Sequence, residues 1–131
     1  MKTWLTYAVN AEMFWSKLPF LERLNRIADA GFEPFEFWGY ADKDVTAIAE
    51  LSAARDLKPV QFVAGWGLNS QKAKATLLAS LPKAVAAAKQ LNVEMMTVVA
   101  GDEIKGVPRA KQTEDVLPPC AKRPSSCKPK E

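Results

Sequence analysis

Short apolar runs alternate with amphipathic segments along most of the chain. Strands are predicted where a run is rich in Val, Phe, Trp or Thr, at Leu5–Ala11, Phe35–Trp38, Pro59–Ala64 and Val93–Ala100. Helix-like spacing of apolar residues fills the intervals between these runs. Strand and helix therefore repeat every ~30 residues, which is typical of parallel strands joined by right-handed crossover helices.

Capping residues and prolines predict where the helices begin and end. In the first helix, whose apolar face starts at Phe20, Ser16 is the predicted N-cap, Pro19 suits an early helical position and Gly31 marks the end. A fourth helix is predicted to begin around Thr113.

The second and third helices are bounded in the same way. The second is predicted from the capping Asp44 to Leu57, because Pro59 cannot continue it. The third is predicted from about Gln71 to Leu91 with Ser70 as its cap, and Pro82 is expected to kink it or break it into two pieces.

Two parallel-sheet architectures fit this pattern, an open doubly wound sheet and a segment of an eight-stranded βα barrel. Residues 10–15, after the first strand, contain no glycine, although a dinucleotide-binding loop needs several. Glycines instead follow the later strands, at Gly39, Gly65, Gly67 and Gly101. We therefore predict an α/β fold, about four parallel βα units forming the N-terminal half of a barrel that is not closed.

Strand alternation singles out Glu36 as a candidate site residue. Phe35 and Phe37 share one face of the second strand, so Glu36 and Trp38 share the other, which would point into the lumen of a barrel. A carboxylate beside a tryptophan suits a pocket for a polar substrate. Alternatively, Glu36 is a hydrogen-bond partner for other residues or lies at a solvated strand end.

Polar residues inside other apolar runs are further candidates. Burial would oblige Asn10 in the first strand and Gln61 in the third to find hydrogen bonds, either to a substrate oxygen or within the protein. Trp15 and Trp66 lie beside strand-end loops, where they could form a pocket wall or simply pack.

Complete catalytic or metal-binding sets are missing. Asp102 and Glu103 follow the fourth strand and could bind a cation or cap a helix, but solvated loop charges explain them as well. With no His and no second carboxylate set at a strand end, the chain offers neither a complete metal site nor a Ser–His or Cys–His pair. We therefore assign no catalytic residue.

Charge and cysteine divide the chain into two regions, 1–116 and 117–131. The net charge of +3 comes from 18 basic and 15 acidic residues, yet residues 1–116 carry 14 of each sign. The tail LPPCAKRPSSCKPKE holds the whole excess, both cysteines and four of the nine prolines. The body of the chain is predicted to have no disulfide and to bind neither nucleic acid nor membrane. Because no secretory signal or long apolar run is seen, we expect a cytoplasmic protein.

Several strings resemble the first half of the hydroxypyruvate isomerase family of xylose-isomerase-like TIM barrels. The likeness covers roughly residues 5–116, and its most specific parts are Asn10-x-Glu12-Met13, Pro19-Phe20-Leu21-Glu22-Arg23, Glu36-Phe37-Trp38 and Met96-Thr97-Val98-Val99. Their order and spacing together carry the resemblance.

The resemblance implies a barrel that interconverts hydroxypyruvate and tartronate semialdehyde, or a related hydroxy-carbonyl pair or small sugar, with Mg²⁺ or Mn²⁺. It also implies that the metal ligands and two catalytic glutamates lie on strands five to eight, beyond this chain. The matching positions are therefore predicted only to line the pocket: Asn10, Glu36, Trp38, Gln61 and Trp66. The chain alone is expected to be inactive.

Four parallel strands cannot close a barrel, so we expect two open sheet edges and an exposed apolar lumen face. Such a half-barrel could associate with itself or pair with a partner chain. This is the non-catalytic alternative.

The tail has two interpretations. Written in G/C-rich codons and read two bases later, residues 117–131 become an amphipathic helix in which positions 120 and 127 are apolar and share one face, which indicates a frameshift. Alternatively, Lys122, Arg123, Lys128 and Lys130 bind phosphates or acidic surfaces while Cys120 and Cys127 pair or hold a metal. Dispersed charges without an aromatic and a lone Cys-x6-Cys are weak signals, so the frameshift, with a poorly ordered tail, is favoured.

Overall fold

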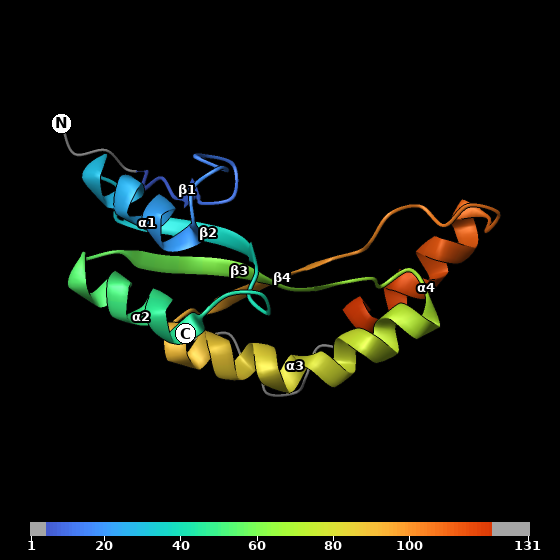
Figure 1. Ribbon diagram of the computed structural model, residues 1–131. Helices are drawn as coiled ribbons and strands as arrows, with labels where there is room; N and C mark the ends of the chain where they lie inside the picture. The colour runs from blue at the N-terminus through green and yellow to red at the C-terminus, as the bar shows by residue number, and fades with distance from the viewer. Residues whose placement is uncertain (1–4, 122–131) are drawn as a thin grey trace. The chain divides into compact units, whose positions relative to one another are not determined.

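The elements of the chain alternate between strand and helix as predicted (Figure 1). The computed structural model describes residues 5–121, with side chains for residues 5–116. In chain order the elements are β1 (Val9–Asn10), α1 (Phe20–Asp29), β2 (Pro34–Gly39), α2 (Val45–Ala54), β3 (Lys58–Trp66), α3 (Gln71–Leu91), β4 (Met95–Val99) and α4 (Arg109–Ala121). The strands form one sheet in the order β1-β2-β3-β4, and the parallel pairing predicted for βα units is confirmed.

One face of the sheet is buried by phenylalanines and helices. Phe35, Phe37 and Phe62 are at most 1% exposed. The Phe37 ring centroid lies 5.5 Å from that of Phe62 and 5.6 Å from that of Phe20 in α1. The same cluster includes side chains from all three crossover helices, among them Leu24, Ile27, Ile48, Ala84, Ala88 and Leu91. The core therefore lies on one side of the sheet, and the other side is left for polar residues.

Three helices end in the same backbone motif, in which one residue takes a left-handed conformation. Gly31 has φ +81°, Asp56 +54° and Asn92 +53°. The amide after each of them donates back to a carbonyl in the last turn: Phe32 to Ile27 (3.2 Å), Leu57 to Ser52 (2.9 Å) and Val93 to Ala88 (2.8 Å). This is the Schellman arrangement, which satisfies the last carbonyls of a helix. It turns the chain into the following strand within a few residues.

The N-terminal caps are partly as predicted. Asp44 accepts a hydrogen bond from the amide of Ala47 (3.0 Å), and Ser70 accepts one from the amide of Ala73 (3.2 Å). The expectation that Ser16 caps the first helix is wrong. That helix begins directly after Pro19 without a side-chain cap, because the intervening residues form turns instead.

Several predicted bounds shift. The first strand is only two residues long, because Leu5 and Tyr7 lie outside the ladder with 65% of each exposed. The second helix ends at Ala54, where the chain enters the left-handed Asp56, and the fourth begins at Arg109 behind Pro108. The apolar run at the start of the chain is therefore longer than the hydrogen-bonded ladder of β1. Capping sets the end of α2 and the start of α4.

The chain divides into two compact units. One comprises Met1–Gly65 with Ser80–Val98, and the other comprises Trp66–Ala79 with Val99–Glu131. The division falls inside α3, which continues through Pro82 and is not broken into two helices. Pro82 has no amide hydrogen to donate to the carbonyl of Leu78, so the helix loses one internal hydrogen bond close to this division.

The structure describes only the first part of the predicted tail. The backbone of α4 continues to Ala121, across the predicted boundary at residue 116, while residues 122–131 lie outside the described part. The phosphate- or metal-binding roles considered for the tail therefore concern side chains that lie outside the described ones: Lys122, Arg123, Lys128, Lys130, Cys120 and Cys127. Among the described residues, no helix is both long and apolar enough to cross a membrane.

The residues in left-handed conformation at the helix ends allow a test of their effect on stability. An added Cβ at Gly31 would meet nothing within 4 Å, so Gly31→Ala should cost only backbone strain, about 1–2 kcal/mol of unfolding free energy. Asp56→Gly removes a side chain from a similar conformation and should not lower stability. Urea unfolding followed by circular dichroism measures both variants. Equal destabilisation by the two substitutions would contradict the left-handed conformations assigned to Gly31 and Asp56.

Candidate functional site

A row of polar side chains crosses the sheet on the face opposite the phenylalanines. The Nδ2 of Asn10 in β1 donates to Oε1 of Glu36 in β2 (3.0 Å), and the Nε2 of Gln61 in β3 donates to Oε2 of the same carboxylate. The hydroxyl of Thr97 in β4 donates to Oε1 of Gln61 (2.7 Å). One hydrogen-bonded chain therefore links all four strands, with Glu36 as its only charged member.

The strand register brings these side chains together. Asn10 pairs with Glu36, and Glu36 pairs with Gln61, so the three residues are lateral neighbours. The pairing shifts between Phe35 and Glu36, because Phe35 pairs with Pro59 and Val60 is passed over. Without this irregularity the partner of Glu36 would be Val60, and Val60 rather than Gln61 would share its face of the sheet. The β-bulge thus places Gln61 beside the carboxylate.

The orientations of both amides are fixed by second hydrogen bonds. Asn10 Oδ1 accepts the backbone amide of Glu12 (2.9 Å), and Gln61 Oε1 accepts the Thr97 hydroxyl. Each amide nitrogen is therefore turned toward Glu36. Two donors aimed at one carboxylate suit its ionised form, which only accepts hydrogen bonds.

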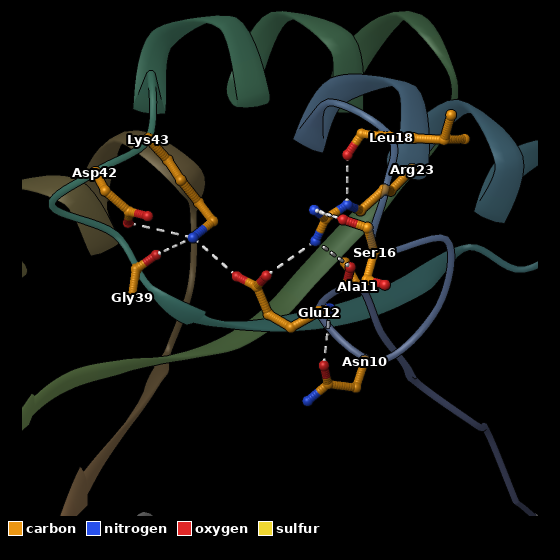
Figure 2. Close-up of polar contacts among 9 residues, drawn as sticks. All are labelled: Asn10, Ala11, Glu12, Ser16, Leu18, Arg23, Gly39, Asp42 and Lys43. Atoms are coloured by element: carbon orange, nitrogen blue, oxygen red, sulfur yellow. Dashed lines mark hydrogen bonds and ion pairs between the residues drawn. The ribbon is translucent and has the colours of Figure 1, made fainter.

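A cluster of paired charges lies beside this row, where the chain leaves β1 and β2 (Figure 2). The carboxylate of Glu12 lies between two cations, 3.1 Å from Arg23 Nη1 and 2.8 Å from Lys43 Nζ. Only 15% of the Glu12 and Arg23 side chains and 9% of the Lys43 side chain are exposed. Lys43 also donates to the carbonyl of Gly39 (2.8 Å), so it joins the turn after β2 to the loop after β1.

Arg23 holds the loop between β1 and α1 in place. Its guanidinium donates to the carbonyls of Leu18 (2.8 Å) and Ser16 (2.8 Å), as Figure 2 shows. Within this loop Trp15 takes a left-handed φ of +49°, a strained conformation for a bulky residue. The loop is therefore fixed in a conformation that leaves three apolar side chains exposed, Met13 (69%), Phe14 (53%) and Trp15 (43%).

The tryptophans predicted to line a pocket are both exposed. Trp38, two positions after Glu36 in β2, is 50% exposed. Trp66 ends β3 and is 51% exposed, but it belongs to the other compact unit. The structure therefore brings Asn10, Glu36 and Gln61 into contact and leaves the two rings open to solvent.

The second unit has a separate pocket of about 350 Å³ next to α4. The buried side chain of Gln112 bonds to Ile104 and Val107 and holds their loop against the helix. Asp102 and Glu103 are exposed there and make no ion pair with another described residue, which agrees with solvated loop charges. Within the part of the chain that the structure describes, no three His, Cys, Asp or Glu side chains are grouped to hold a metal.

Two parts of this arrangement were not predicted from the sequence. Thr97 is a polar residue inside an apolar strand, so the reasoning that singled out Asn10 and Gln61 could have found it. The cluster of Glu12, Arg23 and Lys43 had no such signal, because its members come from three separate segments and meet only in the fold.

The polar row also revises one expectation about the open face. An apolar lumen face was predicted, but the middle of this face consists of hydrogen-bonded polar groups. The sequence had left open whether Glu36 bonds to protein groups or to a substrate, and the structure shows that it accepts bonds from two protein amides.

Comparison with solved structures supports the barrel architecture. A protein described as an AP endonuclease, family 2, from Brucella melitensis matches with a TM-score of 0.72 and 24% sequence identity, over 83% of this chain. The match covers 45% of the other chain, so this chain spans about half the length of that structural neighbour. No family model matches the sequence, and no curated protein does. The chain therefore has the fold of about half of a TIM barrel.

The charge cluster generates a prediction about stability. Glu12→Gln leaves two largely buried cations without their common partner, and we expect it to cost about 2–3 kcal/mol of unfolding free energy. Lys43→Met keeps an apolar side chain while removing the cation, whose Nζ lies 5.0 Å from the Phe20 ring centroid. The double variant should lose less stability than the sum of the two single variants in urea unfolding. Strict additivity would show that the two charges do not interact.

Proposed function

We propose that this chain forms the substrate-binding wall of a xylose-isomerase-like barrel. The reaction class is aldose–ketose isomerisation, acting on hydroxypyruvate and tartronate semialdehyde or on a related small sugar. The observation that carries the proposal is the row from Asn10 through Glu36 and Gln61 to Thr97. In a barrel this face lines the lumen, and substrate-binding residues of such folds lie near the C-terminal ends of the strands.

The row is suited to binding because its groups are held before any ligand arrives. The amides cannot rotate freely, since each is bonded at both ends, and the carboxylate sits between them. The loop after β1 is fixed next to this row by Arg23 and Glu12. Pre-positioned polar groups lower the entropic cost of binding a small polar molecule.

The described residues do not fit the divalent metal that the family resemblance implies. Glu36 is the only carboxylate in the row, and both its oxygens already accept hydrogen bonds from neutral amides. Proton abstraction beside a carbonyl requires a positioned base and a counter-charge for the resulting anion. We therefore assign these residues to substrate binding and propose that the chain alone does not turn over substrate.

A second proposal is that the half-barrel acts through association. In the described chain β1 and β4 each have one neighbouring strand, so each presents an unpaired edge. A second copy of the chain or a partner chain would cover these edges. This proposal needs no catalysis.

The first test measures binding and turnover on the purified chain. Saturation-transfer NMR should detect binding of a small ketose, and Glu36→Ala should reduce the signal severalfold, because the acceptor at the centre of the row is lost. An isomerisation assay with hydroxypyruvate and Mg²⁺ or Mn²⁺ should show no turnover. Clear activity would contradict the proposed inactivity, and absence of any binding would contradict the substrate wall.

The second test measures size in solution. Light scattering during gel filtration should give a mass above that of one 14.4 kDa chain if the strand edges drive association. Replacing an edge residue of β4, Val98→Pro, should shift the mass downward, since proline cannot donate in a strand ladder. A folded wild-type monomer at high concentration would contradict this second proposal.

A further inference from the structure

Glu36 keeps an uncompensated negative charge at the centre of the polar row. Its two partners, Asn10 and Gln61, are neutral amides, and Glu36 forms no ion pair with any residue that the structure describes. The nearby cations Arg23 and Lys43 are balanced by two other carboxylates, because both pair with Glu12 and Lys43 also pairs with Asp42. The side chain of Glu36 is half-buried, so water screens its charge less than at an exposed position.

The row retains both donors and acceptors for further hydrogen bonds. A carboxylate offers about four acceptor positions, and the amides fill one on each oxygen of Glu36. Asn10 and Gln61 each retain a second N–H, and the Thr97 oxygen can still accept a hydrogen bond. Adjacent donors and acceptors match a ligand whose groups both donate and accept, as hydroxyls do.

An anionic ligand would use only part of this capacity. A ligand carboxylate could accept from the two amides, but it would offer nothing to Glu36 and would be repelled by its charge. A hydroxyl, in contrast, can donate to Glu36 while it accepts from an amide. The wall therefore distinguishes ligands by charge.

We propose that the Asn10–Glu36–Gln61–Thr97 row binds the hydroxyls of a neutral polyol or ketose and disfavours anionic hydroxy acids such as hydroxypyruvate. This inference rests on the proposed function, because it concerns the same face of the sheet. Among the substrates considered there, it selects the small sugar. Glu36 acts as the acceptor that a sugar hydroxyl requires and a carboxylate cannot use.

The test compares two ligands that differ in one group. Dihydroxyacetone is hydroxypyruvate with its carboxylate replaced by a hydroxymethyl group. Each is titrated into the ¹⁵N-labelled full chain, and the side-chain amide signals of Asn10 and Gln61 are followed. Dihydroxyacetone should bind at least about tenfold more tightly, a margin expected from one partly screened charge repulsion.

Two variants separate charge from shape. Glu36→Gln should bring the affinity ratio close to one, by weakening the ketose and strengthening hydroxypyruvate, whereas Thr97→Val removes the end of the row without changing charge and should keep the preference. Equal or tighter binding of hydroxypyruvate by the wild-type chain overturns the inference, whether or not the Glu36→Gln variant folds. An unchanged ratio in a folded Glu36→Gln variant also overturns it.

Two further outcomes are distinguishable. If neither ligand shifts the amide signals, the proposed function fails together with the inference. If both bind equally, only the inference fails. Mg²⁺ alone is titrated as a third probe and should leave these amide signals in place; a shift caused by Mg²⁺ would make the row a cation site and overturn the proposed ligand class.

Discussion

A carboxylate in the middle of a sheet face must be satisfied by its neighbours, and much of this structure depends on how Glu36 is satisfied. Its oxygens accept hydrogen bonds from the strand on each side, from Asn10 and from Gln61. Because both donors are fixed at their other ends, the row joins four strands through side chains as well as through the backbone ladder. The opposite face has the complementary role, since its phenylalanines hold the helices to the sheet.

The charge cluster serves a different purpose from the polar row. Paired charges that are largely buried contribute little net stability, because desolvation offsets their attraction. Glu12, Arg23 and Lys43 nevertheless connect the loop after β1 to the turn after β2. Their effect is geometric, because they hold the ends of two strands and the exposed side chains of one loop in a single arrangement. Such fixed loops at strand ends are where barrels of this class bind substrates.

Much of the fold could be predicted from local patterns. Asp44 and Ser70 cap their helices as their side-chain chemistry indicates, and the alternation of Phe35, Glu36 and Phe37 sorts the two faces of β2 correctly. Ser16 was misleading because a turn competes with the helix for the same residues. The first strand is shorter than its apolar run, because an apolar pattern in the sequence does not show whether a partner strand continues beside that run.

The sequence by itself determined the alternation of strands and helices, the parallel sheet, and the polar character of Asn10, Glu36 and Gln61. These properties follow from residue type and spacing along the chain. Only the tertiary structure decided that the three side chains meet, because their contact depends on a register shift at Val60 that no local pattern encodes. It also decided that Glu12 has two cationic partners, since residues distant in sequence become neighbours only when the strands pair and the helices pack.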